Sequence, residues 1–140
     1  MLIGEDGANL VTRSKSIAFI ATGKYWVNNH AHVLENNEYV LLHYLCYYIN
    51  SIDLGPYITG SAQPKMTQEK MNIIPVPLPT IPEQQEIVRI LDSLFEKEQY
   101  AKELCNVIDM INLMKKAILA RAFRGELGTN DPSEERVVGL

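Results

Sequence analysis

The chain has 140 residues, 46% of them apolar, and a formal net charge of −4. This length predicts one domain of ordinary size, with room for an appendage. No apolar run is long enough to predict a membrane span, and the segment Met1–Glu5 lacks the features of a signal peptide. Residues 1–82 carry 5 basic and 6 acidic side chains, and residues 126–140 carry 1 and 4. Because the excess negative charge lies in the tail, any contact with DNA requires a local basic patch.

Short apolar runs bounded by turn residues predict a small sheet in the first part of the chain. The expected strands cover residues 2–3, 17–21, 25–27 and 31–34. Gly4 to Gly7 predicts a tight turn after the first strand, and Asn28 to His30 predicts a polar turn between the last two.

Asn36 or Asn37 can cap a helix from Glu38 to Ser51, which we expect to be largely buried because it is apolar nearly all round. Residues 60–65 form a polar loop, and Thr67 is expected to cap a short helical turn through Met71. Residues 73–78 are expected to be an extended edge segment, since prolines at alternate positions remove backbone donors.

A single long helix over residues 83–125 is the strongest prediction, because its apolar residues recur at heptad spacing without glycine or proline. Its length would be about 60 Å. Thr80 to Glu83 forms a capping box with Pro82 in the first turn. Gly125 supplies a left-handed residue after the last turn. The chain is therefore expected to be α+β, a small mixed sheet with a packed helix, followed by a long C-terminal coiled-coil helix.

The apolar seam of this helix predicts a partner helix, since a small domain cannot cover it. We define the dimerisation seam as Ile87, Ile90, Leu94, Leu104, Ile108, Ile111 and Ile118. Residues 83–98 are mainly acidic and residues 115–124 are basic without an acid. Antiparallel pairing places opposite charges together, which predicts an antiparallel homodimer with Leu104 near its two-fold axis.

Few residues favour catalysis. Cys46 and Cys105 lie in helical patterns and are expected to be buried, reduced thiols in the cytoplasm. His30 and His32 share one face of a strand, which leaves a metal-dependent enzyme open as an alternative, although no third ligand has supporting spacing. No phosphate-binding glycine loop or nucleophilic triad is present. We expect no cofactor and no catalytic residue.

Residues 23–30 concentrate polar and aromatic side chains: Gly23-Lys24-Tyr25-Trp26-Val27-Asn28-Asn29-His30. Asparagine can bind adenine edges, and lysine or histidine can hold phosphate, so the segment is compatible with DNA binding. The alternative is a polar hairpin with Trp26 in the core, which requires no ligand.

Several motifs together resemble specificity subunits of type I restriction–modification systems. They are Gly60-Ser61-Ala62-Gln63-Pro64-Lys65-Met66, the stretch from Tyr25 to Leu34, Ile81-Pro82-Glu83-Gln84-Gln85-Glu86-Ile87-Val88 with the preceding prolines, and the stretch from Ala117 to Leu127. They occur in the family's order and span nearly the whole chain. Pro79-Thr80-Ile81-Pro82 departs from the family, which has a double proline there.

The resemblance implies a protein that performs no chemistry, binds double-stranded DNA, and docks methyltransferase and restriction subunits. A complete subunit in that family has two target recognition domains and two long antiparallel helices. This chain would hold the later half of one recognition domain at residues 1–79, one spacer helix at 80–125, and a flexible tail at 126–140. The expected function is a DNA sequence-specificity component or a truncated half of one, located in the cytoplasm.

The residues expected to contact DNA are the polar members of the two family-like loops. They are Lys24, Tyr25, Asn28, Asn29, His30, Gln63 and Lys65. The alternative for several of them is that they only hold the loops together by hydrogen bonds. The alternative for the whole chain is a coiled-coil assembly protein whose recognition remnant binds nothing.

Overall fold

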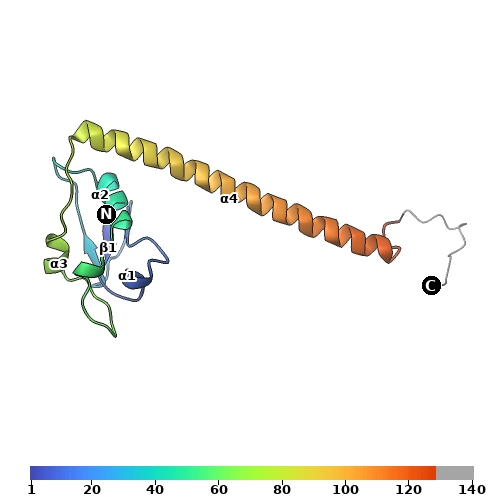
Figure 1. Ribbon diagram of the computed structural model, residues 1–140, viewed down its shortest axis with the longest axis horizontal. Coiled ribbons are helices and arrows are strands. Elements are labelled where there is room, and N and C mark those ends of the chain that lie inside the picture. Colours follow the sequence, from blue (N-terminus) through green and yellow to red (C-terminus); the bar gives the residue numbers. More distant parts are fainter. Residues whose placement is uncertain (129–140) are drawn as a thin grey trace, which may run out of the picture. The chain divides into compact units, whose positions relative to one another are not determined.

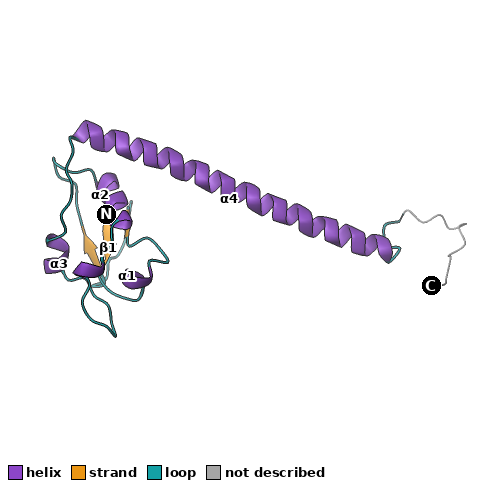
Figure 2. Cartoon of the chain, viewed as in Figure 1, coloured by secondary structure: helices purple, strands orange, loops and turns teal. Residues whose placement is uncertain are grey.

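The computed structural model describes residues 1–128, which form an α+β fold (Figures 1 and 2). In chain order the elements are β1 (Leu2–Gly4), α1 (Asn9–Thr12), β2 (Ala18–Phe19), β3 (Ala31–Val33), α2 (Leu42–Ser51), the 3-10 helix η1 (Gly55–Tyr57), α3 (Gln68–Asn72) and α4 (Ile81–Phe123). The α+β prediction and the long helix are confirmed. Of the expected flexible tail, residues 129–140 lie outside the described part. The chain divides into two compact units, Met1–Asp92 and a second that begins at Ser93.

The sheet has the strand order β2-β1-β3, and both pairings are antiparallel. The expectation of a mixed sheet is therefore wrong. Ile3 and Ala18 pair across it and are 0% and 1% exposed, because their face packs against α2. Phe19 and Val33 flank Leu2 on the opposite face and are 50% and 52% exposed. The main core cluster therefore lies on one face of the sheet, and on the other face Leu2 alone of these three is buried, at 8% exposure.

The core joins the covered face of the sheet to α2 and the loops around it. It consists of Met1, Ile3, Leu10, Ile17, Ala18, Leu45, Ile49, Leu54, Met66 and Ile74. The expected burial of α2 is confirmed on one side, where Tyr44, Leu45 and Ile49 are buried. Cys46 is half-buried, with its thiol on the Ala18 carbonyl, but Cys105 is exposed on α4, so its expected burial is wrong for the single chain. Both cysteines are free.

Three local predictions are wrong. Residues 25–27 are not a strand, and residues 73–78 do not join the sheet. Helix α2 begins at Leu42 rather than Glu38. Asn37 accepts from the N–H groups of Tyr39 and Val40 at 2.8 and 2.9 Å, which forms a turn instead of a helix cap. The N–H of Leu41 then bonds to Gln84, in α4.

Segment 75–79 runs beside α2 and is held by tyrosine hydroxyls rather than by a strand ladder. Tyr48 donates to the Pro75 carbonyl at 2.6 Å and Tyr44 donates to the Pro77 carbonyl at 2.9 Å. Because proline has no N–H, its carbonyl is the group that a neighbour can use. Tyr47, on the same helix, donates to the Asp92 carboxylate, which raises the pKa of Tyr47 to about 12.

Gln84 is the only buried polar side chain of the described residues, at 0% exposure. Its Oε1 accepts from the Leu41 N–H at 2.9 Å, and its Nε2 donates to the carbonyls of Tyr39 and Pro79, each at 2.9 Å. All but one of the hydrogen bonds that a glutamine amide can make are thus satisfied. The first turn of α4 is thereby joined to the start of α2 and to the segment that precedes α4.

Both ends of α4 match their sequence signals in most respects. The Glu83 carboxylate accepts from the Thr80 N–H at 2.8 Å and from the Thr80 hydroxyl at 2.7 Å, and these bonds hold the pKa of Glu83 below its ordinary value. In the expected capping box the Thr80 hydroxyl would instead accept from the backbone N–H of Glu83. Gly125 has φ +70°, and the N–H groups of Gly125 and Glu126 bond to the carbonyls of Ala122 and Arg121, as in a Schellman motif.

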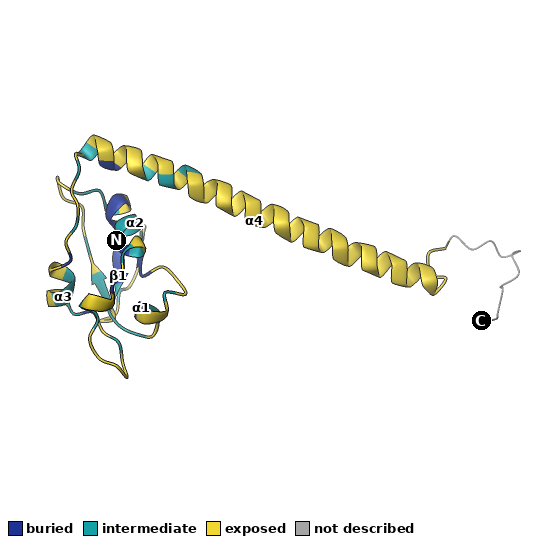
Figure 3. Cartoon of the chain, in the orientation of Figure 1, coloured by how far each residue is buried: buried dark blue, intermediate teal, exposed yellow. Residues whose placement is uncertain are grey.

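The 43 residues of α4 would span about 65 Å. Figure 3 shows that nearly its whole length is exposed, with burial only in its first turns. Residues of the dimerisation seam are between 37% and 57% exposed. No helix among residues 1–128 is long and apolar enough to cross a membrane.

We predict that replacing Gln84 destabilises the fold more than an equivalent change at the next residue. Gln84→Leu keeps the side-chain size but leaves the Leu41 N–H and two carbonyls without their partner. The expected loss is about 2–3 kcal/mol, since each buried unpaired group costs roughly 1–3 kcal/mol. Chemical unfolding at one fixed protein concentration measures it.

Gln85→Leu is the matched control, because Gln85 is exposed and makes none of these hydrogen bonds. Its expected change is within about 0.5 kcal/mol. Equal losses for the two variants would show that the buried amide does not hold α4 to α2.

Candidate nucleic-acid interface

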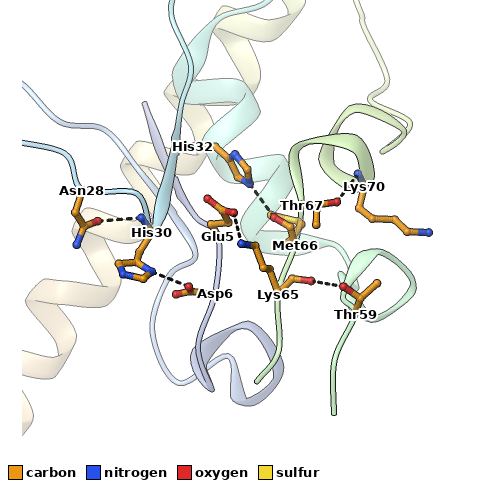
Figure 4. Close-up of polar contacts among 10 residues, drawn as sticks. All are labelled: Glu5, Asp6, Asn28, His30, His32, Thr59, Lys65, Met66, Thr67 and Lys70. Carbon is orange, nitrogen blue, oxygen red and sulfur yellow. Dashed lines mark hydrogen bonds and ion pairs between the residues drawn. The ribbon is translucent and has the colours of Figure 1, made fainter. Parts of the chain in front are cut away.

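The two loops expected to bind DNA meet at one end of the sheet, around the segment that follows β1. The N–H of Glu5 bonds to the His30 carbonyl at 3.0 Å, and the N–H of Gly7 bonds to the Pro64 carbonyl at 3.0 Å. The Glu5 carbonyl accepts from the N–H of Met66 at 2.7 Å. Residues 5–7 therefore lie between the end of loop 23–30 and the end of loop 60–65 (Figure 4).

His30 is fixed on one side of this segment. Its Nδ1 lies 2.7 Å from Oδ2 of Asp6, and its N–H donates to the Asn28 side-chain oxygen at 3.1 Å. The imidazole remains 55% exposed, whereas the Asp6 carboxylate is 19% exposed. Asp6 therefore orients an imidazole whose other face is open to solvent.

Lys65 is fixed on the other side. Its Nζ lies 2.9 Å from Oε1 of Glu5, and the hydrogen bond and charge of Glu5 raise the pKa of the lysine. Backbone hydrogen bonds of 2.8 Å in both directions pair Lys65 with Thr59 and close the loop between them. Gly60 has φ +81°, and a Cβ there would lie 2.5 Å from the Gln63 carbonyl oxygen, so the loop requires glycine.

These contacts engage both carboxylates at this end of the sheet. Glu5 and Asp6 each have a basic partner, and residues 7–34 contain no aspartate or glutamate. That window contributes Arg13, Lys15 and Lys24. A chain with a net charge of −4 thus has a stretch of consecutive residues that carries only basic charge, which is the kind of local distribution that phosphate contact requires.

The structure brings together three of the seven residues expected to contact DNA. His30 and Lys65 pair with Asp6 and Glu5, and the Asn28 side chain accepts from the N–H of His30 (Figure 4). The other four, Lys24, Tyr25, Asn29 and Gln63, are exposed, and within residues 1–128 their side chains make no hydrogen bond or ion pair.

Trp26 is 96% exposed, so the interpretation that placed it in the core of a hairpin is wrong. Tyr25, beside it, is 49% exposed. In a strand, side chains alternate between the two faces, so one of these two neighbouring rings would have pointed inward. Residues 25–27 form no strand, and both rings are exposed. The apolar character of Trp26 alone therefore did not predict its burial correctly.

Glu5 and Asp6 are the site residues that sequence reasoning missed. Their partners are 60 and 24 residues away in the chain, so no local pattern pairs them. The available signal was an acidic pair in a turn directly after a strand, where side chains emerge at a sheet end.

His30 and His32 contact different partners. His30 is paired with Asp6, and Nε2 of His32 lies 2.8 Å from the Met66 carbonyl oxygen. The part of the chain that the structure describes holds no group of three or more histidine, cysteine, aspartate or glutamate side chains placed to bind a metal.

Comparison with known proteins identifies the class of protein. The family described as type I restriction modification DNA specificity domain matches residues 8–110, which include both loops and most of α4. The chain belongs to this family, and the resemblance noted from its motifs is confirmed.

Curated relatives point the same way. A putative type I restriction enzyme specificity subunit of Haemophilus influenzae is 38% identical over 94 residues, which are 67% of this chain and 24% of the relative. The EcoDI specificity subunit of Escherichia coli is 45% identical over 65 residues, 46% of this chain and 15% of that subunit. The StySPI specificity subunit of Salmonella potsdam is 31% identical over 100 residues, which are 67% of this chain and 21% of that subunit. No solved structure matches the chain.

The chain spans about a quarter or less of the length of these relatives. The matched region is therefore a segment of a larger architecture in each of them.

We predict that the fluorescence of Trp26 reports a fully hydrated indole. Trp26 is the only tryptophan, so no other residue contributes to the emission. In dilute protein the emission maximum should match that of free tryptophan, and acrylamide should quench it as efficiently. Emission shifted to shorter wavelength at every concentration would show that the indole is covered.

Proposed function

We propose that this chain is a non-catalytic DNA sequence-specificity component of a type I restriction–modification system, or a truncated half of one. One observation carries the proposal: a single family match spans the two polar loops and the long helix, and those loops converge at one end of the sheet. The relatives are themselves named as specificity subunits of restriction enzymes. On this proposal the chain binds double-stranded DNA and needs no cofactor.

The polar side chains divide by the DNA groups that they can contact. Asn28, Asn29 and Gln63 carry amides, which can bond to adenine edges in the major groove. Lys24, His30 and Lys65 can hold phosphate, which positions the protein without reading sequence. Tyr25 offers an exposed ring and hydroxyl. Within residues 1–128 the amide of Asn29 has no partner, which makes it available for a base edge.

We predict different effects for the two loops. Asn29→Ala should weaken binding to the preferred sequence by roughly 1–3 kcal/mol and leave random DNA almost unaffected. Lys65→Ala should weaken both equally and reduce the salt slope by about 1. A library selection with the unaltered protein first defines the preferred sequence, and titrations across salt then measure the affinities. Equal losses on both DNAs for Asn29→Ala would contradict a reading role.

A second function is favoured by the ion pairs of the site. Lys65 and His30 are engaged by Glu5 and Asp6, which lowers their availability for phosphate. On this alternative the chain is a coiled-coil assembly protein with a recognition remnant that binds nothing. The unaltered protein would then show no salt-dependent binding in the same titrations.

The long helix supplies the proposed assembly surface. Successive residues are 100° apart around a helix. Ile81, Gln84, Val88 and Leu91 are partly or fully buried and share one face, which packs on the first unit. The start of the dimerisation seam lies about 100° away from that face, so Ile87 and Ile90 are 37% and 45% exposed. Packing within the first unit therefore leaves Ile87 and Ile90, the first two seam residues, available.

Charge favours an antiparallel homodimer. The acidic residues 83–98 would lie beside the basic residues 115–124 of the second copy, whereas parallel pairing would place acid beside acid. Exposed pairs contribute only a few tenths of a kcal/mol each, so the seam supplies affinity and the charges select direction. Two copies would also provide two recognition segments, one at each end of the helix pair.

We predict that the chain sediments at about twice its mass of 15.9 kDa. Leu104→Asp should give monomers, because it places a carboxylate in the seam at the two-fold axis. Asp109→Ala is the control, since it alters charge on the same helix outside the seam. Cysteines at positions 87 and 122 in different copies should crosslink, in a background where Cys46 and Cys105 are serine. Efficient crosslinking of position 87 to itself would establish parallel helices instead.

The remaining partners follow from the proposed family role. The chain would dock the methyltransferase and restriction subunits, with residues 1–79 as a partial recognition domain, 80–125 as the dimerisation and spacer helix, and 126–140 as a tail. We place this assembly in the cytoplasm, where its DNA is. Copurification with a methyltransferase encoded in the same operon tests the docking.

A further inference from the structure

The loop Arg13–Ser16 lies at the same end of the sheet as the candidate interface, although no motif drew attention to it. The Gly4 N–H bonds to the Ile17 carbonyl at 2.9 Å, and the next residue along, Glu5, bonds to His30. The start of β2 and the start of β3 are therefore neighbours of the same end of β1. The loop that precedes β2 opens on the end of the sheet that holds His30 and Lys65.

The backbone of this loop is held by hydrogen bonds from the Asn9 side chain. Arg13 adopts a left-handed conformation with φ +52°, which is unusual for a residue with a side chain. The Asn9 side chain accepts from the N–H of Lys15 at 2.9 Å and from the Ser14 hydroxyl at 3.1 Å. Its amide nitrogen donates to the Lys15 carbonyl at 3.1 Å. One asparagine thus fixes both backbone polar groups of Lys15.

The loop is also anchored to the C-terminus of α2. Arg13 donates to the Asn50 carbonyl at 2.7 Å, which offsets the negative end of that helix. The Asn50 side chain in turn accepts from the N–H groups of Ile17 and Ala18. Nη1 of Arg13 is buried and has no hydrogen-bond partner within residues 1–128. The guanidinium therefore keeps unneutralised positive charge beneath the loop.

A cavity of about 240 Å³ opens here, lined by Arg13, Ser14, Lys15, Ser16 and Asn50. No carboxylate lines it. Asp53 lines a second cavity, which shares Arg13 with this one, and its carboxylate accepts from the Gly55 N–H at 2.8 Å. Lys15 is exposed, and within the described residues its ammonium has no ion-pair partner. In this respect it differs from Lys65, which is held by Glu5.

We propose that the Arg13–Ser16 loop is a phosphate-contact site for the DNA backbone. This inference rests on the proposed DNA-binding function and adds a contact outside both family-like loops. Lys15 supplies the ammonium that holds a phosphodiester oxygen, and the hydroxyl of Ser16 can donate to the same phosphate. Arg13 is a positioning residue, because its Nη2 donates to the end of α2 and its Nη1 is buried. Asn9 presents Lys15 with its backbone already ordered, which lowers the entropy lost on binding.

The test measures the salt dependence of DNA binding by the full chain. Replacing one phosphate-contacting lysine removes about one released counterion, so Lys15→Gln should make the slope of log K against log salt shallower by about 0.9. The loss should be the same for specific and random DNA. Lys15→Arg should retain the slope of the unaltered protein. Lys102→Gln is the charge-matched control, since Lys102 is paired with Glu98 on α4 and should leave the slope unchanged.

The outcomes separate this inference from the function on which it rests. If the unaltered protein binds DNA with a salt slope that Lys15→Gln does not change, the loop is not a phosphate contact and the proposed function stands. If the unaltered protein shows no salt-dependent binding, the proposed function fails and this inference with it. Thermal unfolding of each variant shows whether the fold is intact. Because the Lys15 side chain makes no hydrogen bond or ion pair within the described residues, no change in the unfolding midpoint is expected for Lys15→Gln.

Inorganic phosphate distinguishes a DNA phosphodiester from free phosphate at the same loop. At constant ionic strength, exchanging chloride for phosphate should weaken DNA binding equally in the unaltered protein and in Lys15→Gln. Binding of inorganic phosphate to the unaltered protein but not to Lys15→Gln, together with an unchanged DNA salt slope in that variant, would assign the loop to free phosphate and overturn its assignment to the DNA backbone.

Discussion

The hydrogen bonds of Gln84 are the interaction on which the rest of the structure depends. A buried amide must be satisfied, and the three groups that satisfy it belong to the turn before α2, to Leu41, and to the segment before α4. The start of α2 has no side-chain cap, so the N–H of Leu41 relies on this partner. Because hydrogen bonds are directional, the amide also fixes the rotation of α4 about its axis at Gln84. Within the first unit, that rotation determines which face of the first turns of α4 packs inward, and it leaves Ile87 and Ile90 37% and 45% exposed.

Within the first unit, the contacts of Gln84 and the polar loops lie toward opposite ends of a very small sheet. β1 runs from Met1, whose amino group donates to the Leu34 carbonyl, to Gly4, which neighbours Ile17 and Ala31. The segment after Leu34 leads to the turn that Gln84 holds, whereas the segment after Gly4 leads to Glu5 and Asp6. The contacts of the first turn of α4 and the polar contacts of the loops therefore share a core without sharing residues. A change at one end can alter assembly or DNA contact while the other end keeps its geometry.

Local signals allowed the sequence to predict the helices that have caps. Thr67 accepts from the N–H of Lys70, the Glu83 carboxylate bonds to Thr80, and Gly125 adopts the left-handed conformation, as the motifs indicated. The α+β class followed from the change of hydrophobic period near Thr80. What could not be predicted includes two features that depend on partners far along the chain, the late start of α2 and the pairing of Glu5 with Lys65. Within residues 1–128 the structure gives no such partner for residues 25–27, which do not form the expected strand. Trp26 shows the same limit, because its exposure depends on what the tertiary structure brings beside it.

The ion pairs at the sheet end bear on how a nearly neutral unit could engage DNA. Glu5 and Asp6 are less exposed than Lys65 and His30, so the acidic groups lie beneath the basic ones. An approaching phosphate would meet the basic side chains first and would compete with a carboxylate for each of them. That exchange lowers the net gain of each contact, since a pair already formed is lost. Affinity from Lys65 and His30 alone would therefore be modest, and basic groups without a carboxylate partner, such as Lys24 and Lys15, would contribute more per contact. Sequence selection by this end of the sheet would then depend on its amides, because the paired charges position the loops more than they attract DNA.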